Sequence, residues 1–467
     1  MLKLFNTLTR RLATFKPLRG KTIGLYTCGP TVYNYAHIGN LRTYVFEDIL
    51  KRTLLGAGYR IKHVMNITDV GHLTNDSNLG EDKIEAGARR EGKSAWNIAK
   101  FYTRAFQHDL RALNVLFPDV WCRATAHIKE QIALIKTLER KGYTYLTSDG
   151  VYFDTKKFRA YGVLVGKEGL RGLQEGARIE KHPEKRNPTD FALWKLSPST
   201  GTLRQGSGHK RQMEWSSPWG VGFPGWHIEC SAMSMKYLGA TFDIHCGGID
   251  HIPIHHTNEI AQSEAATGKP FARYWLHGEF LTIDGGRMGK SEGNFIPLHL
   301  LIERGMSPLA YRYLLLQTHY RKQLVFSWEA LEAAEQGYKN LVARVAALDS
   351  KPDVDQKFIQ QVKQSFEDDL NAPEALAALW EMLKSPAPPS QKTIFALDAW
   401  FGLDIKKSVA ALKKKTRVPT AITTLLKKRE NARTEKKWRL ADELRAQILE
   451  AGWQIDDAPA GPVVYKK

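Results

Sequence analysis

Cysteine is scarce in this sequence, and its scarcity argues against a secreted scaffold held together by disulfides. Four cysteines occur in 467 residues, namely Cys28, Cys122, Cys230 and Cys246. So few thiols in so long a chain favour a reducing compartment and metal ligation. Long apolar runs are also missing, since no stretch approaches the roughly 20 residues that a membrane-spanning helix needs. The sequence therefore predicts a cytoplasmic protein that does not enter a membrane.

Acidic residues are absent from the first 46 positions. The opening segment is basic and mildly amphipathic, as in an organellar transit peptide. Against that interpretation, Cys28 and a motif at His37 follow almost at once, which leaves little sequence to discard. We therefore keep the cytoplasmic prediction.

Negative charge is in short supply over the whole chain as well. Lys and Arg number 68 against 49 Asp and Glu, which gives a formal net charge of +19. Such an excess favours a polyanionic partner, most commonly nucleic acid, although a solvated basic surface is the alternative. Hydrophobic residues make up 43% and charged residues 25%. This composition and length indicate a globular chain of two to four domains.

A strand, a helix and a second strand follow one another closely near the N-terminus. Residues 21–28 are an apolar run that ends at a Gly-Pro turn, residues 39–58 are amphipathic, and residues 61–68 are again apolar. Strand, helix and strand with short connections form a βαβ unit, hence a parallel sheet with ligands at its carboxyl edge. Because Cys28 and Thr68 fall at that edge, the sequence predicts a site there.

This alternation lapses between residues 116 and 225. The segment contains short strands and a basic, Gly/Ser-rich stretch at 197–212, which we expect to be an exposed loop. We interpret 116–225 as a domain inserted between two halves of the sheet, which resumes at 242–246. From residue 326 the pattern is helical, and residues 419–467 are basic with a short extended tail.

Four side chains suited to one zinc ion are scattered along the sequence. His255 and Glu259 are spaced i, i+4, which places both on one face of a helix. Cys28 and Cys230 add two thiols, and this donor set suits zinc. Taken singly, each is more often structural, since a free cysteine usually behaves as a small buried hydrophobe.

Two further histidines lie close in sequence to these candidate ligands. His251 is close enough in sequence to be an alternative ligand. His256 is expected to point off the metal-facing side of the helix, as are residues 257 and 258.

Two short motifs on either side of this set suit a nucleotide. Residues 37–40 (HIGN) precede a helix N-terminus, where backbone N–H groups favour phosphate and Gly39 permits close approach. Residues 287–291 (RMGKS) belong to a Gly-rich loop that would bring Lys290 to the α-phosphate and the leaving pyrophosphate. Either motif alone is a common accident, whereas the pair in this order indicates a nucleotide site.

Together these residues resemble cysteinyl-tRNA synthetases, a class I aminoacyl-tRNA synthetase family, over almost the whole chain. HIGN is similar to the class I HIGH signature, with Asn40 in place of the last His. RMGKS is similar to the KMSKS motif, with Arg287 and Gly289 as departures. Asn40 can still donate a hydrogen bond but carries no charge. Cys246 stands where the family usually has Gly, and we expect it to pack passively.

The resemblance implies an α/β fold with four parts. These are a Rossmann-like parallel-sheet catalytic domain (1–115 and 226–325), an inserted connective domain (116–225), a helical tRNA-binding bundle (326–418) and a small basic anticodon-binding region (419–467).

The resemblance also implies a ligase that activates L-cysteine with ATP and Mg²⁺ and transfers it to the 3′ end of tRNA. The implied zinc ligands are Cys28, Cys230, His255 and Glu259. The implied ATP-binding residues are His37, Gly39, Asn40 and Lys290, of which His37, Asn40 and Lys290 are catalytic. The implied cysteine-binding residues are Gly29, Thr68, Trp226 and Asp250. Three aromatic residues would offer stacking surfaces to the anticodon loop, namely Trp438, Trp453 and Tyr465, although core packing is the favoured interpretation for any single one of them. Nothing in this scheme requires more than a monomer.

Two alternatives stay open. A ligase with the same core that joins cysteine to an amino sugar would share the zinc and ATP signatures, but it would not need a basic helical C-terminal region. A non-catalytic tRNA-binding paralogue is kept open by the departures at Asn40, Arg287 and Gly289.

Overall fold

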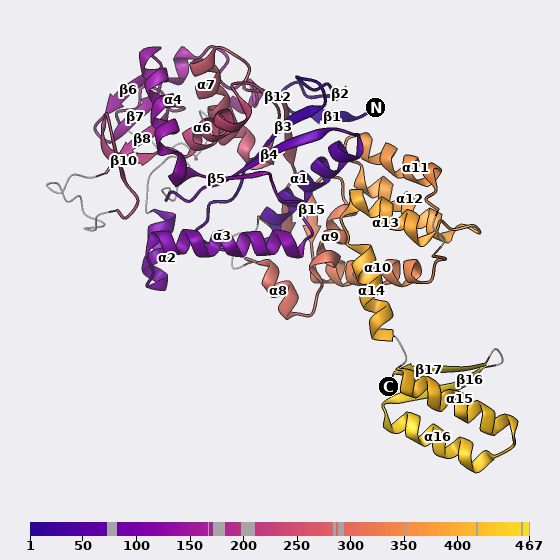
Figure 1. Cartoon of the computed structure of the whole chain (residues 1–467). Helices are drawn as coiled ribbons and strands as arrows, with labels where there is room; N and C mark the ends of the chain where they lie inside the picture. The colour runs from indigo at the N-terminus through magenta and orange to yellow at the C-terminus, as the bar shows by residue number, and fades with distance from the viewer. Residues whose placement is uncertain are drawn as a thin grey trace.

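A five-stranded parallel sheet lies at the centre of the larger part of the molecule (Figure 1). The computed structural model describes residues 1–71, 82–166, 168–170, 183–197, 211–283, 286–287, 294–350, 353–416, 419–458 and 461–466. The strand order is β12-β11-β3-β4-β5, with every neighbouring pair parallel. The strands are β3 (Thr22–Thr27), β4 (Arg60–Ile67), β5 (Val120–Arg123), β11 (Phe242–Gly248) and β12 (Ala272–Gly278). The predicted α/β class and its βαβ unit are confirmed.

One strand lies inside the segment interpreted as an insertion. β5 begins at Val120, four residues past the expected boundary at 116, and pairs in parallel with β4. The strand is only four residues long, so its periodicity was too short to distinguish it from a loop. The parallel sheet therefore extends to Arg123, and the boundary at 116 is a correction.

Helices cover both faces of the sheet, as the near-continuous burial of parallel strands requires. On one face lies the helix that follows β3, together with a helical pair from the next crossover. These are α1 (Ile38–Gly56), α2 (Lys83–Glu91) and α3 (Ala95–Ala112). On the other face lie α4 (Ile128–Arg140), α6 (Trp226–Leu238) and α7 (Thr257–Thr267).

Alternate residues of each strand consequently enter two different cores. Leu25 and Cys246 pack in the core that contains the buried side chains of α1. Tyr26 and Cys28 belong to the core formed with α4, α6 and α7. Cys246 is thereby directed away from the face that carries the candidate metal ligands, which agrees with a packing role.

The inserted segment forms its own antiparallel sheet, seen at the upper left of Figure 1. Its strand order is β6-β7-β8-β10-β9. The strands are β6 (Thr144–Thr147), β7 (Gly150–Phe153), β8 (Phe191–Leu196), β9 (Trp215–Ser217) and β10 (Gly220–Pro224). Most of the expected loop at 197–212 lies outside the described residues.

Smaller elements connect the catalytic sheet to the helical region. An N-terminal hairpin is formed by β1 (Lys3–Asn6) and β2 (Arg11–Thr14). A three-stranded sheet has the order β14-β13-β15. These strands and their adjacent helices are β13 (Leu281–Ile283), β14 (Gly286–Arg287), β15 (Leu324–Phe326), α8 (Leu298–Glu303) and α9 (Pro308–Leu316).

The predicted all-helical region follows β15. Its helices are α10 (Trp328–Ala346), α11 (Gln356–Glu367), α12 (Ala372–Lys384), α13 (Gln391–Phe401) and α14 (Ile405–Thr416). Within the described part of the chain, no helix is both long and apolar enough to cross a membrane.

A buried ionic cluster joins this bundle to the catalytic domain. Asp48 of α1 accepts hydrogen bonds from Arg52 and Arg312 at 2.7 and 2.5 Å, and from the backbone N–H of Leu116. Arg312 also donates to the carbonyl of Phe401 in the bundle, and Arg52 donates to that of Ala399. The helix that opens at the HIGN motif is thus tied directly to α9 and α13.

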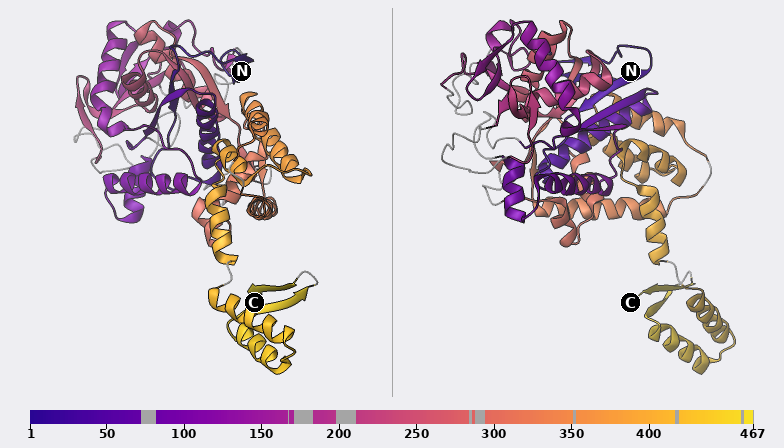
Figure 2. Two further views of the ribbon diagram at one scale, coloured as in Figure 1. Left: turned by 45° about the vertical axis from the view of Figure 1, so that its right-hand side comes forward. Right: turned by 60° about the vertical axis from the view of Figure 1, so that its left-hand side comes forward.

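The C-terminal unit is small and stands apart from the main body in Figures 1 and 2. It comprises α15 (Thr420–Thr434), α16 (Trp438–Glu450), β16 (Trp453–Ala458) and β17 (Gly461–Lys466), the two strands being antiparallel. Trp453 is 7% exposed and packs with Ile422 and Ile448. Of the two interpretations of Trp453, core packing is therefore confirmed and the stacking surface is wrong, because the tail folds back as a hairpin over the helices. The Tyr465 side chain lies outside what the structure describes.

Candidate metal and nucleotide site

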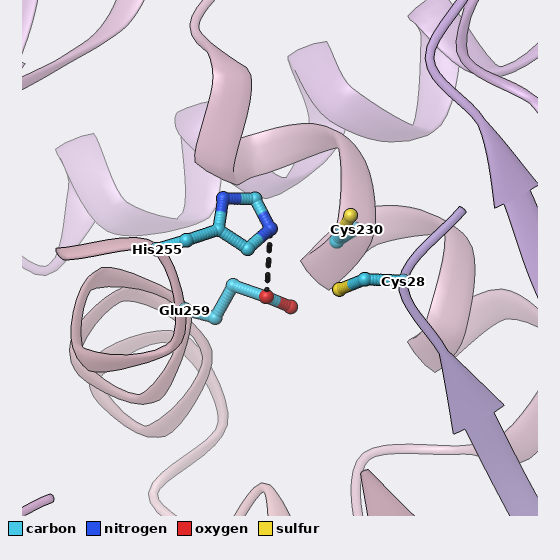
Figure 3. Close-up of side chains that lie close together, drawn as sticks. All are labelled: Cys28, Cys230, His255 and Glu259. Carbon is cyan, nitrogen blue, oxygen red and sulfur yellow. Dashed lines mark ion pairs between the residues drawn. The ribbon is translucent and has the colours of Figure 1, made fainter. Parts of the chain in front are cut away.

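The four predicted metal ligands come from four separate segments and meet at one point (Figure 3). Cys28 follows β3, Cys230 is in α6, His255 is in a π-helical turn spanning Ile252–His256, and Glu259 is in α7. One ligand atom from each residue lies within 4.8 Å of the other three, and all four residues are buried. Such spacing suits donors that share one ion.

The Glu259 carboxylate is held from two sides. Its Oε1 lies 3.0 Å from Nε2 of His255 but has no hydrogen-bond partner among the described residues. Its Oε2 accepts a hydrogen bond from Nε2 of His245 at 3.1 Å. A carboxylate oriented through one oxygen by a second residue, with its other oxygen beside another candidate ligand, is the arrangement expected of a metal ligand.

The π-helical turn gives His256 a position that the sequence pattern did not suggest. His256 Nε2 lies 3.4 Å from Sγ of Cys28, so this side chain points into the site. Its Nδ1 is 2.7 Å from Nε2 of His277. The expectation that His256 points away is wrong, because it assumed regular α-helical phase and a π turn changes that phase. Cys28, His245, His256 and Glu259 also form a second group with ligand spacing.

The electrostatics of the cluster favour charged donors. Burial raises the pKa of the Cys28 thiol. Burial acts the same way on Cys230, but hydrogen bonds with Cys28 and His255 outweigh it and lower the pKa of that thiol. Burial lowers the pKa of His255, yet Glu259 and Cys230 raise it to about 10. Burial also opposes ionisation of Glu259, and His245 and His255 nevertheless lower its pKa to about 2. Without a metal, the geometry thus favours the ionised forms of Cys230 and Glu259, which can bind a cation, and the protonated form of His255, which must lose its proton before it can.

Three of the four residues expected to contact cysteine border this group. The ring of Trp226 lies 4.3 Å from that of His255. Thr68 donates to the buried Glu229 carboxylate at 3.1 Å. Gly29 donates its N–H to Oδ1 of Asn66, and a Cβ at this position would lie 1.7 Å from the Asn66 carbonyl oxygen. Only glycine fits there.

Asp250, the fourth of these residues, lies toward the nucleotide motif. Burial lowers the pKa of His37 to about 4, and Asp250 acts against this shift. His37 is therefore a neutral imidazole, able to accept one hydrogen bond and donate another.

The HIGN motif begins α1 in a manner that explains Asn40. Nδ1 of the His37 ring accepts a hydrogen bond from the backbone N–H of Asn40 at 3.2 Å. In return, the backbone N–H of His37 donates to Oδ1 of Asn40 at 3.3 Å. This reciprocal pair is a capping box, which fixes the first turn of the helix. His37, Gly39 and Asn40 thus lie together at a helix N-terminus, where phosphate binds well. Lys290 lies outside the described residues, and of Arg287 only the backbone, in β14, is described.

Two other points concern residues near the ligands. His251 belongs to neither ligand group among the described residues, although its Nδ1 is buried without a hydrogen-bond partner there. His245 and Glu229 were missed by the sequence analysis. The one signal that could have indicated His245 is a histidine within a short strand, at 242–246, that leads to the carboxyl edge of the sheet.

The comparisons with known proteins agree with this geometry. Mycobacterium tuberculosis methionyl-tRNA synthetase in complex with methionyl-adenylate has a similar fold, with a TM-score of 0.52 and 16% identity. The match covers 85% of this chain and 91% of that one, and it supports the fold alone. Residues 14–336 match the family described as "tRNA synthetases class I (C) catalytic domain". Fold and site thus define a class I aminoacyl-tRNA synthetase.

Full-length relatives narrow the assignment. Cysteine–tRNA ligase 1 of Burkholderia lata is 50% identical, covering 99% of this chain and 97% of that protein. The cysteine–tRNA ligase of Treponema denticola is 46% identical, covering 100% and 99%. Residues 415–459 match the "Cysteinyl-tRNA ligase anticodon binding domain". The chain belongs to the cysteine–tRNA ligase family, as the resemblance implied.

Proposed function

We propose that the chain activates L-cysteine with ATP, transfers it to the 3′ end of the cysteine tRNA, and selects the thiol with a zinc ion at the buried cluster. The observation that carries the zinc assignment is the convergence of Cys28, Cys230, His255 and Glu259 within 4.8 Å of one another. Family membership indicates the class of reaction, and this set of metal donors accounts for the selection of cysteine as the amino-acid substrate.

The residues present fit zinc better than a hard cation. Two sulfur donors and one imidazole suit zinc, whereas Mg²⁺ and Ca²⁺ take oxygen donors. Oε1 of Glu259, which contacts His255 at 3.0 Å, is consistent with a fourth, oxygen donor. When bound there, zinc supplies a soft Lewis acid that prefers a thiolate to the hydroxyl of serine.

Selection by sulfur would make a separate editing site unnecessary. A pocket that relies on shape discriminates near-isosteres only by about a hundredfold. The buried ligands therefore account for specificity that packing could not provide, and we assign Gly29, Thr68, Trp226 and Asp250 to hold the rest of the amino acid. Asp250 is the candidate partner of the ammonium group.

ATP binding is assigned to the start of α1. Backbone N–H groups at this helix N-terminus, together with neutral His37 and the side-chain amide of Asn40, would bind the phosphates. The positive charge of Lys290 would neutralise the negative charge that develops on the leaving pyrophosphate. The cysteine carboxylate attacks the α-phosphorus, pyrophosphate leaves with Mg²⁺, and cysteinyl-adenylate then passes its acyl group to a tRNA ribose hydroxyl, releasing AMP. Catalysis here is positioning and charge neutralisation, with no covalent protein intermediate.

The remaining parts are assigned to tRNA and to the cell compartment. The bundle (326–418) and the C-terminal region (419–467) would bind tRNA, and Trp438 is 59% exposed, as a stacking residue must be. All four cysteines are free and buried, which supports a cytoplasmic enzyme. A monomer carries every proposed site residue.

Aminoacylation with cysteine against serine, alongside elemental analysis for zinc, tests this proposal. We expect about one zinc per chain and cysteine-dependent ATP–pyrophosphate exchange. Exchange without tRNA charging would favour the amino-sugar ligase, which the anticodon-binding match already disfavours. Intact zinc without exchange would favour the non-catalytic paralogue.

A further inference from the structure

The solvent-facing side of α3 carries positive charge and aromatic rings but no carboxylate. Exposed residues recur every three or four positions along it, namely Trp96, Asn97, Lys100, Phe101, Arg104, His108 and Arg111. The one acid of the helix, Asp109, is buried. This face is thus uniformly suited to a polyanion.

Two of its cations have no ion-pair partner in the described part of the protein. Neither Lys100 nor Arg104 forms an ion pair with a described carboxylate. Nearby, Arg90 and Lys93 both pair with Glu91 at 3.2 Å. The difference matters because an unpaired cation is available to a phosphate without breaking an existing contact.

Two large aromatic side chains lie on the same face. Trp96 is 47% exposed and Phe101 is 42% exposed. The Phe101 ring contacts that of Tyr35 edge-on, with centroids 6.1 Å apart. Tyr35 precedes His37 by two residues, so this surface adjoins the nucleotide motif.

The position of α3 relates it to the C-terminal unit. In Figures 1 and 2, α3 lies along the lower edge of the main body, the side from which α14 leads down to that unit. The exposed face of α14 is also basic, with Lys406, Lys407, Lys413 and Lys414. One basic helix, α3, therefore lies near the HIGN motif, and a second, α14, leads to the anticodon-binding unit.

We propose that the exposed face of α3 docks the acceptor arm of tRNA, an inference that rests on the function proposed above. Lys100 and Arg104 contact backbone phosphates, which position the RNA without reading its sequence. Phe101 stacks on an unpaired base near the 3′ end, since every base offers a face to an aromatic ring. The arm is thereby guided past Tyr35 to the site at His37.

The first test neutralises the two cations in the full-length enzyme. For the double variant Lys100→Gln/Arg104→Gln we expect the KM for a cysteine tRNA transcript to rise about tenfold at low salt. The salt dependence of log KM should flatten by about one to two. ATP–pyrophosphate exchange, which needs no tRNA, should be unchanged.

A matched control is available on α4, at the opposite end of the main body in Figure 1. Lys129 and Lys136 are exposed there on a helix that also carries Glu130 and Glu139. Lys129→Gln/Lys136→Gln removes the same charge and should leave the KM for tRNA within about twofold of the parent value.

The second test separates stacking from charge. Phe101→Ala should raise the KM for tRNA by about tenfold while leaving its salt dependence unchanged. Both variants should weaken binding of an acceptor minihelix but not of an anticodon stem-loop.

An unchanged KM and salt slope in the double variant, or equal weakening with the anticodon stem-loop, overturns the proposal. So does a parallel loss of ATP–pyrophosphate exchange, since the residues would then act on the catalytic site. Absence of exchange in the parent enzyme would instead reject the proposed function.

Discussion

Two buried clusters of charged side chains lie on opposite faces of the central sheet, and they differ in one respect. In the cluster of Asp48, Arg52 and Arg312, each charged group is hydrogen-bonded to another or to a backbone group. In the thiol–imidazole–carboxylate cluster, Nδ1 of His245 has no hydrogen-bond partner among the described residues, and Oε1 of Glu259 has only its 3.0 Å ion-pair contact with His255. Because an unpaired buried polar atom is costly, the first cluster is complete as it stands, whereas the second keeps a polar atom that has no hydrogen bond in the described structure.

The largest effect should come from removing a thiol of the second cluster. Cys230→Ser replaces a strong zinc ligand by a poor one. We expect loss of zinc and a fall of about a thousandfold or more in cysteine-dependent ATP–pyrophosphate exchange, equivalent to about 4 kcal/mol. Metal analysis and exchange kinetics check this.

Cys122→Ser is the control for that change. Cys122 is buried too, but its Sγ donates to the Met65 carbonyl at 3.5 Å, which a hydroxyl can also do. Zinc content and exchange should stay near the parent values. Retained zinc and full activity in Cys230→Ser would remove the distinction drawn between the two clusters.

Breaking the first cluster should damage stability rather than metal binding. Asp48→Asn leaves two buried guanidinium groups without their carboxylate, so the free energy of unfolding should fall by about 3 kcal/mol or more. Denaturant unfolding measures it, and folded protein should keep its zinc. Asp368→Asn, at a surface pair 3.7 Å from Lys3, should change stability by less than about 0.5 kcal/mol.

A smaller change sharpens the role of the carboxylate. Glu259→Gln keeps an oxygen donor but loses the charge, and we expect zinc affinity to fall by about 10- to 100-fold. Competition with a chelator gives the affinity. Glu264 lies on the same helix, and its side chain accepts a hydrogen bond from the Phe271 N–H. The variant Glu264→Gln should therefore bind zinc as the parent does.

The smallest effect is expected at His251. If it is not a ligand, His251→Leu should leave zinc content intact and alter exchange by less than about threefold. Loss of zinc in this variant would instead place His251 in the ligand set and contradict the assignment of Glu259 or His255.

Much of this architecture could be predicted from the sequence, because its signals are local and periodic. The strand at 22–27, the helix from Ile38 and the helical region after β15 all have lengths and patterns that few other structures share. The four metal-ligand candidates were also identified in advance, from residue chemistry, one i, i+4 spacing and a family resemblance. The structure brings them together, and their role as ligands stays a prediction.

What sequence reasoning missed depends on long-range packing or irregular backbone. β5 is too short for a periodic signal, and its place in the sheet follows from pairing with β4. Trp453 looked like an RNA contact but is covered once the terminal hairpin forms. The predicted direction of the His256 side chain is wrong because the prediction assumes a regular α-helix. The role of Asn40 depends on its reciprocal hydrogen bonds with His37, which the motif alone does not indicate.

The π-helical turn at Ile252–His256 makes chain length itself a marker of the metal centre. Deleting one residue such as Pro253 would let 252–267 continue as an ordinary α-helix. It would also turn His255 and Glu259 by about 100° relative to β11, away from Cys28. A sequence alignment that tolerates a gap in this segment would therefore group proteins with the centre and proteins without it. The number of residues between Gly248 and Glu259 would distinguish proteins with the metal centre from proteins without it, whereas residue identity in the alignment would not.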